Sequence, residues 1–252
     1  TEVLAHLLDK EDLSGLDRIQ GMFVVAWTRG NEDITVARDR HGETPLHYSL
    51  LENSLFPHFT FSSEIKGLRA MGIHYSTINM LSPGSYIRAT NLDSIKTEKG
   101  LWYDIRQNLK KNLFTDRDSA SQHIKTLVES GSLERTVSAV PVCVLLSGGV
   151  DSSVIALAAL KNIPNLTSYI AVHNEKSKDL YCAREVAEML NIELVEVKVE
   201  PPIVDDVKDI INTIEMPYKA QVEIAWPCIK LAQRIASDGF KVVLSGEGSD
   251  EL

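Results

Sequence analysis

The sequence has few of the residues that build metal centres or disulfide scaffolds. Among its 252 residues are three cysteines, odd in number and far apart, and seven histidines without metal-ligand spacing. We therefore expect neither a zinc site nor a disulfide framework. Cys143, Cys182 and Cys228 lie in apolar surroundings, which predicts buried thiols in a reducing compartment, the cytoplasm.

The chain also lacks a long apolar run, a signal peptide and an excess of positive charge. A membrane span needs about 20 apolar residues, and no stretch comes near this length, so no membrane association is expected. The net charge of −9 argues against a nucleic-acid partner. A hydrophobic content of 44% and a charged content of 24% are ordinary for a water-soluble globular protein of one large or two smaller domains.

Common nucleotide-binding signatures are absent too. No G-x-x-x-x-G-K-[ST] sequence occurs, which excludes a Walker loop. The stretch GEGSDE, residues 246–251, lacks the third glycine of a dinucleotide fingerprint, and the protein-kinase signatures are missing.

The most informative stretch present is VCVLLSGGVDSS, residues 142–153. Its apolar run, residues 142–146, predicts a strand buried on both faces. The Ser-Gly-Gly sequence that follows allows a tight turn whose N–H groups point into one concavity, and the next helix adds positive potential at its N-terminus. The stretch therefore predicts a cradle for phosphate or pyrophosphate.

A second stretch near the end of the chain repeats this pattern. Residues 241–244 predict a strand, and the Ser-Gly-Glu-Gly sequence after it is expected to bend the chain and present Glu247 and Asp250. Carboxylates beside polyphosphate repel it unless a divalent cation lies between them, and Mg²⁺ prefers a few carboxylates plus phosphate oxygens. Asp151 and Asp250 are the candidate Mg²⁺ ligands.

Both stretches lie where predicted strands and helices alternate. The expected strands are residues 142–146, 167–173, 192–199 and 241–245. The expected helices are residues 151–162, 179–190, 204–215 and 223–238. This alternation predicts an α/β fold, a doubly wound parallel sheet with ligands at the carboxyl ends of its strands.

The first half of the chain is expected to be β-rich, with few helices. The expected strands are residues 21–27, 34–37, 59–63 and 86–89. A short helix over residues 64–70 is expected to be capped by Ser62 or Ser63.

These motifs carry a family resemblance. SGGVDS resembles the pyrophosphate-binding loop of ATP pyrophosphatases of the adenine-nucleotide α-hydrolase type, and with LSGEGSDE it is similar to the synthetase domain of glutamine-dependent asparagine synthetases. GMFVVAW, ARDRHGETPLHY, FSSEIKGL and SPGSY resemble the later part of that family's glutaminase domain, an N-terminal-nucleophile hydrolase fold. The expected parts are a partial glutaminase-like domain (1–108), a helical connector (109–139) and a truncated synthetase domain (140–252).

The resemblance implies an ATP-dependent ligase that adenylates aspartate, releases pyrophosphate and AMP, and amidates the acid with ammonia from glutamine. It implies adenine contacts for Leu145 and Val172, a pyrophosphate cradle of Ser147, Gly148, Gly149 and Ser152, Mg²⁺ at Asp151 and Asp250, and an AMP site at Ser245 and Gly246. Glu247 would take a proton from the attacking ammonia, which requires a base within hydrogen-bond reach.

Several residues depart from the family pattern. No cysteine nucleophile opens the chain, and the family's catalytic lysine would lie beyond Leu252, so we expect an internal fragment that is inactive alone. Residues 221–227 fall where the family often carries threonines and an arginine that help to place its acidic substrate, and Glu223 in this segment would repel aspartate. A β-lactam-synthetase-like ring-closing ligase and a non-catalytic nucleotide-binding paralogue therefore stay open, as does a homodimer. Trp226 and Cys228 are expected in the core.

The candidate charged residues also have structural explanations. Asp151 could act only as a helix N-cap, and Glu247 and Asp250 could be solvated turn residues. Arg38 and Arg40 are expected to form ion pairs at a domain interface, with anion binding as the alternative.

Overall fold

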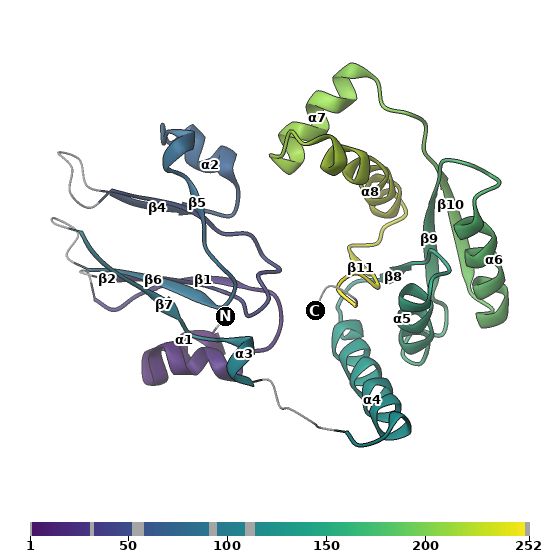
Figure 1. Ribbon diagram of the computed structural model, residues 1–252, viewed down its shortest axis with the longest axis horizontal. Coiled ribbons are helices and arrows are strands. Elements are labelled where there is room, and N and C mark those ends of the chain that lie inside the picture. Colours follow the sequence, from purple (N-terminus) through teal and green to yellow (C-terminus); the bar gives the residue numbers. More distant parts are fainter. Residues whose placement is uncertain (1, 31–32, 52–57, 91–94, 109–113, 250–252) are drawn as a thin grey trace. The chain divides into compact units, whose positions relative to one another are not determined.

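The protein is described by a computed structural model that divides into two compact units, Thr1–Lys111 and Asn112–Leu252 (Figure 1). The described residues are 2–30, 33–51, 58–90, 95–108 and 114–249. Each unit is treated by itself. The division into residues 1–108, 109–139 and 140–252 stays a prediction.

The first unit contains two antiparallel sheets, which confirms the expected β-rich half. One has the order β1-β2-β6-β7 and the other β4-β3-β5. The strands are β1 (Val24–Thr28), β2 (Asp33–Arg38), β3 (His47–Leu51), β4 (His58–Ser62), β5 (Asn79–Met80), β6 (Ser85–Thr90) and β7 (Lys96–Leu101). The helices are α1 (Glu2–Glu11), α2 (Ile65–Ala70) and α3 (Ile105–Asn108), with 3-10 turns η1 (Asp12–Arg18) and η2 (Tyr75–Thr77).

The side chains of β2 alternate between two apolar layers in this unit. Val36 packs with Leu46 and Ile87 in a cluster shared by both sheets, whereas Ala37 faces Leu8 of α1. Successive strand residues point to opposite faces, so one strand supplies both layers.

One local prediction in the first unit is wrong, and another is wrong in part. The N-cap of α2 is Glu64 and has no side-chain cap; Ser62 Oγ only accepts the Glu64 N–H at 3.2 Å. Arg38 donates to backbone carbonyls, including Thr44 O at 2.6 Å and Leu81 O at 2.7 Å, and the Arg40 guanidinium lies 4.9 Å from the Tyr103 ring centroid. Among the described residues, these contacts stand in place of the expected ion pairs, and the expected position of both arginines at a domain interface stays a prediction.

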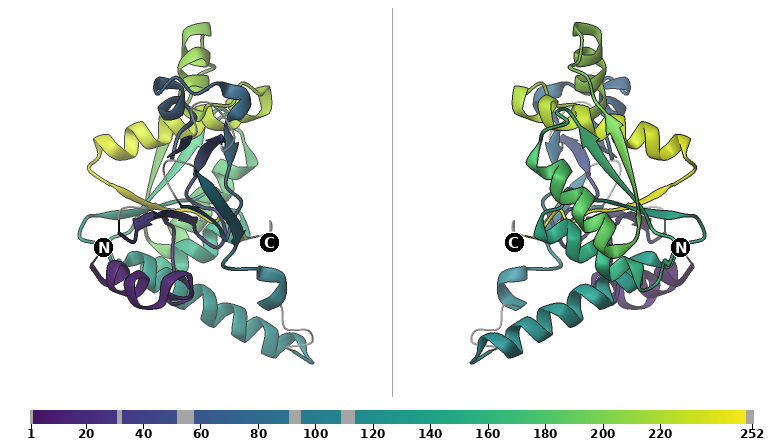
Figure 2. Two further views of the ribbon diagram at one scale, coloured as in Figure 1. Left: turned by 90° about the vertical axis from the view of Figure 1, so that its left-hand side faces the viewer. Right: turned by 90° about the vertical axis from the view of Figure 1, so that its right-hand side faces the viewer.

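The second unit is built on a parallel sheet of order β10-β9-β8-β11. The strands are β8 (Val142–Leu145), β9 (Thr167–Val172), β10 (Glu193–Lys198) and β11 (Val242–Leu244). The helices are α4 (Arg117–Thr136), α5 (Val150–Leu160), α6 (Lys178–Leu190), α7 (Val204–Ile214) and α8 (Lys219–Ser237). The predicted alternation of strands and helices is thus confirmed. The right-hand view of Figure 2 faces the side of the sheet covered by α6.

The sheet is covered by helices on both faces, as expected for a doubly wound fold. Val144 packs against Ala156 of α5 and Leu180 of α6. Its neighbour Cys143 packs on the other face, against Leu231 of α8. A strand with both faces buried needs apolar residues at every position, which explains the continuous apolar run in the sequence.

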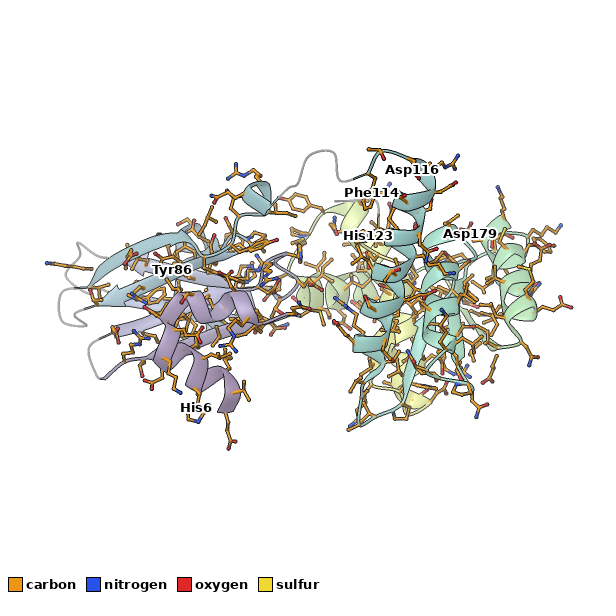
Figure 3. The ribbon with its side chains drawn as sticks, turned by 90° about the horizontal axis from the view of Figure 1, so that it is seen from below. His6, Tyr86, Phe114, Asp116, His123 and Asp179 are labelled. Atoms are coloured by element: carbon orange, nitrogen blue, oxygen red, sulfur yellow. The ribbon has the colours of Figure 1, made fainter. Side chains whose placement is uncertain are left out.

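Helix α4 begins at a side-chain cap. Asp116 accepts the Ser119 N–H at 2.8 Å, and the rings of Phe114 and His123 lie 5.1 Å apart between centroids (Figure 3). Together these contacts fix the first turns of α4. In the part of the chain that the structure describes, no helix is both long and apolar enough to cross a membrane.

Candidate functional site

The first glycine loop, between β8 and α5, needs glycine at residue 148 for two reasons. Gly148 has a φ of +77°, a region that L side chains rarely adopt. A Cβ placed there would lie 2.4 Å from both Ala183 N and Cys182 C, at the backbone of α6. The loop therefore packs directly on α6, with no room for any side chain at this position.

The Ser152 hydroxyl holds this loop together from inside. It accepts the Ser147 N–H at 3.3 Å, lies 3.0 Å from Ser147 Oγ and donates to Gly149 O at 3.2 Å. Ser152 is only 8% exposed. Its role in the structure is to brace the turn that would cradle the pyrophosphate.

The structure contradicts the alternative explanation of Asp151 as a helix N-cap. The N-cap is Gly149, and Asp151 is exposed in the first turn of the helix. A carboxylate in this position is stabilised by the helix dipole and is open to solvent. It is therefore available as a ligand for a hard cation.

The structure brings the two glycine loops together. β11 pairs in parallel with β8, with Leu244 opposite Val144. A Cβ at Gly246 would lie 2.7 Å from Ser152 N and 2.8 Å from Asp151 C, so the second loop touches the start of α5 through bare backbone. The carboxyl ends of these neighbouring parallel strands therefore lie side by side, and their use as one ligand site stays a prediction.

The second loop presents exposed polar groups beside the first. Ser245 and Glu247 are exposed, and Ser249 Oγ donates to Gly246 O at 2.7 Å. Asp250, the second predicted Mg²⁺ ligand, lies outside the described residues. Within the described ranges, no group of three or more His, Cys, Asp or Glu side chains could hold a metal. Of the two predicted Mg²⁺ ligands, the structure describes Asp151 alone, and the Mg²⁺ site stays a prediction.

The side chains of Leu145 and Val172 do not lie on one face. Leu145 packs in the layer covered by α8, and Val172, 6% exposed, packs in the layer of α5 and α6. The sheet separates the two side chains. An adenine ring at this edge could meet both strands only through their main chain.

Sequence reasoning missed the position of Cys228. It was expected in the core, but it is exposed. Partial burial, and secondly the negative charge of Glu247, raise the pKa of the Cys228 thiol. Helix geometry could have predicted this exposure. Trp226 is buried and donates to Glu200 O at 2.7 Å. Because Cys228 comes two positions later in the same helix, its side chain points to the opposite side.

Glu223, the departure from the family pattern, is on the same helix. Its side chain is 65% exposed and 3.6 Å from the Lys219 ammonium. The effect of Glu223 on the choice of acid stays a prediction.

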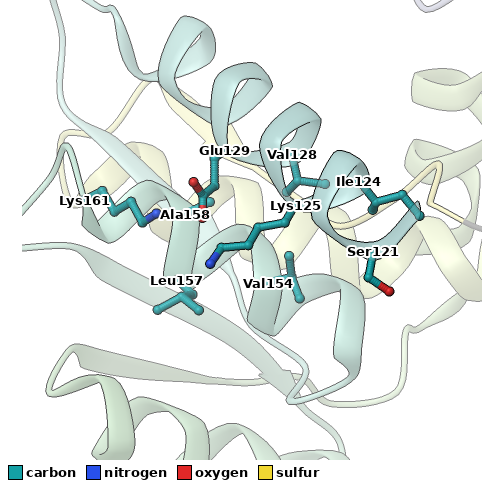
Figure 4. A pocket seen from close by; sticks show the side chains of 9 residues that line it. All are labelled: Ser121, Ile124, Lys125, Val128, Glu129, Val154, Leu157, Ala158 and Lys161. Carbon is teal, nitrogen blue, oxygen red and sulfur yellow. Dashed lines mark ion pairs between the residues drawn. The ribbon is translucent and has the colours of Figure 1, made fainter. Parts of the chain in front are cut away.

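Two of the hollows beside α4 are shared with other elements of the second unit. One is an apolar groove of about 400 Å³ between α4 and α5 that is lined by Ile124, Val154 and Leu157 (Figure 4). Its polar end is closed by the ion pair between Glu129 and Lys161 at 2.7 Å. The other is a pocket of about 240 Å³ between α4 and the second loop, which includes Glu247 in its wall.

Comparison with known proteins agrees with this architecture. Residues 123–252 match the asparagine synthase family, and residues 1–122 match the glutamine amidotransferase domain. Asparagine synthetase [glutamine-hydrolyzing] 1 of Arabidopsis thaliana is 31% identical over 266 residues, covering 100% of this chain and 43% of that protein. Asparagine synthetase B [glutamine-hydrolyzing] of Escherichia coli (strain K12) is 30% identical over 268 residues, covering 100% of this chain and 46% of that protein.

Among solved structures, the NH3-dependent NAD synthetase of Campylobacter jejuni is 19% identical, with a TM-score of 0.35 over 48% of this chain and 54% of that one. This score is too low to carry an argument. The chain spans less than half the length of the two synthetases above. Because the match over residues 123–252 takes in more than half of its residues, the chain belongs to the asparagine synthase family.

Proposed function

We propose that the full-length protein is a glutamine-hydrolysing asparagine synthetase. It would adenylate aspartate with ATP, release pyrophosphate, and amidate the acyl-adenylate with ammonia from glutamine, leaving AMP. The observation that carries the proposal is the contact of Gly246 with Asp151 and Ser152, which joins both glycine loops into one site. Similarity to asparagine synthetases over the whole chain supports it.

The first loop would bind the pyrophosphate part of ATP. The first N–H groups of a helix have no partner within the helix and attract anions. Ser147, Gly148, Gly149 and Ser152 would form the cradle around these groups. Mg²⁺, held by Asp151 with Asp250, would neutralise charge on the phosphates when bound.

The second loop would hold the acyl-adenylate. Ser245 and Gly246 would contact its AMP part, and the main chain at Leu145 and Val172 would contact adenine. Glu247 is exposed and free to accept the proton that the attacking ammonia loses.

Glu223 favours a second candidate. A carboxylate on α8 disfavours a dicarboxylate in its neighbourhood. A ligase for another acid, including a ring-closing one, would tolerate it. The three free cysteines support a reducing compartment, the cytoplasm. Homodimer formation belongs to this proposal as well.

The test is pyrophosphate release by the full-length protein with ATP·Mg²⁺, glutamine and a panel of carboxylic acids. Release that depends on aspartate, with matching glutamate production, supports asparagine synthesis. Release with another acid and without glutamine supports the second candidate. No release with any acid contradicts both and favours a nucleotide-binding paralogue.

A further inference from the structure

The groove between α4 and α5 is an apolar surface that no element in the described part of the chain covers. Ile124, Val154 and Leu157 line it and are 60%, 41% and 51% exposed (Figure 4). Single exposed apolar side chains are ordinary on a protein surface, but a contiguous apolar hollow marks a surface that binds another group. The groove therefore calls for an occupant.

Helix α4 is longer than the helix that supports it. It has 20 residues and packs along α5, which has 11. At 1.5 Å per residue, α4 is about 30 Å long and α5 about 16 Å. The only buried residue of α4 is Ser132, in its second half. Because a helix in water is stabilised mainly by packing of its apolar face, the first half of α4 needs a further partner.

We propose that an amphipathic helix of the full-length protein, from outside residues 1–252, fills this groove. The synthetases of Arabidopsis thaliana and Escherichia coli match the whole of this chain, yet more than half of each lies outside the match. A helix laid along α4 and α5 would bury their facing apolar stripes by ordinary ridge-into-groove packing. The proposal concerns the packing of the full-length chain and holds whichever acid the protein uses.

The surroundings of the groove favour a segment of the same molecule over a second copy. Val128 of α4 lines both the groove and the neighbouring pocket, whose other wall includes Ser245, Glu247 and Ser249. A stretch of chain that follows this loop would therefore start beside α4. The groove is lined by nine residues, whereas a stable interface between two proteins takes about 20 to 30 residues a side.

Charge at the rim of the groove narrows the chemistry of the occupant. The Lys161 ammonium is paired with Glu129 at 2.7 Å. Lys125, also in the rim, forms no ion pair with any residue that the structure describes. The occupant is therefore expected to carry apolar residues at the spacing i, i+3, i+4 and i+7, with an aspartate or glutamate facing Lys125.

The first experiment introduces the photo-crosslinking residue p-benzoylphenylalanine in place of Leu157 in the full-length protein. The matched control replaces Tyr181 of α6, which is 53% exposed and does not line the groove. Irradiation at residue 157 should give an adduct within one chain to a peptide from outside residues 1–252, identified by mass spectrometry. Irradiation at residue 181 should give no adduct to that peptide. An adduct to a second chain or to residues 1–111, or no adduct at residue 157, would overturn the proposal.

Stability of the full-length protein provides a second measurement without a bulky probe. Leu157→Lys should lower the midpoint of urea unfolding by about 1 M, because a covered groove leaves the ammonium buried and unpaired. Tyr181→Lys should leave the midpoint nearly unchanged. Equal midpoints for the two variants would show that the groove stays open to water and would contradict the proposal. Neither measurement requires turnover, so its failure is distinguishable from failure of the proposed function.

Discussion

Gly148 and Gly248 both have positive φ angles, but only Gly148 is packed closely against other backbone atoms. The φ angles are +77° and +92°. A Cβ at Gly148 would meet backbone of α6 at 2.4 Å, and a Cβ at Gly248 would meet nothing within 4 Å. Backbone contacts cannot relax by rotating a side chain. The pair therefore separates the effect of strain from that of close packing.

Gly148→Ala is expected to destabilise the protein by about 2 to 4 kcal/mol, from backbone strain plus overpacking. Gly248→Ala should cost about 1 to 2 kcal/mol, from strain alone. Urea unfolding of both variants measures the difference. Equal losses would mean that the contact of the first loop with α6 is not tight.

The negative charge of Glu247 is the second of two causes that raise the pKa of the Cys228 thiol. Burial raises the pKa of Cys228, and the negative charge of Glu247 raises it further. Glu247→Gln removes the second cause and should lower that pKa. At a fixed pH near 8 the thiolate fraction then increases, so alkylation by iodoacetamide becomes faster.

The rate of Cys228 alkylation as a function of pH checks this. The midpoint should shift to lower pH in Glu247→Gln, while Glu223→Gln, on the same helix as Cys228, serves as the control. An unchanged midpoint in Glu247→Gln would show that the charge of Glu247 does not act on the Cys228 thiol.

At the scale of elements, the turn after β2 is fixed by one buried carboxylate. Asp39 is fully buried, and its carboxylate accepts backbone N–H groups at 2.9 Å and 3.0 Å from Glu43 and Thr44. Burial by itself would raise the pKa of Asp39, but the N–H groups that donate to the carboxylate outweigh it and hold the pKa below the usual 3.8. The turn is thus stabilised by the charged form.

Asp39→Asn is expected to cost about 2 to 3 kcal/mol at pH 7, because charge-assisted bonds are lost. A lowered folded-state pKa gives stability that is present above the unfolded value and lost as pH falls through the folded value. The difference between wild type and variant should therefore shrink below the unfolded value of 3.8. Urea unfolding at pH 7 and pH 3 measures it. A difference of undiminished size at pH 3 would rule out the charge as its source.

At the scale of the whole molecule, the proposed function depends on the two loops acting as one site. Asp151 and Asp179 are matched for a test of this, because each follows its helix N-cap by two residues. The carboxylate of each lies in the first turn of its helix, where the helix dipole stabilises it, but only Asp151 lies at the glycine loops. Figure 3 marks Asp179 on α6.

Asp151→Asn in the full-length protein should weaken ATP·Mg²⁺ binding by at least about 10-fold, since Mg²⁺ loses a carboxylate ligand. Asp179→Asn should bind as the wild type does. Isothermal titration with and without Mg²⁺ gives both values. Equal affinities for the two variants would remove Asp151 from the proposed Mg²⁺ site.

The sequence by itself determined the parallel sheet and the positions of both loops. Apolar runs that end at Ser-Gly, and helices of regular period between them, are local signals. The predicted N-cap of α2 was wrong because Ser62, Ser63 and Glu64 are all plausible N-cap residues in the sequence. Which of them becomes the N-cap depends on the backbone conformation at the start of the helix.

Only the tertiary structure decided which groups meet. Three features join segments far apart in the chain: the contact of Gly148 with α6, the contact of Gly246 with the start of α5, and the pocket between α4 and the second loop. Such contacts depend on strand order and helix packing, which local periodicity does not encode. The opposite faces of Leu145 and Val172 likewise follow from how β8 and β9 align in the sheet.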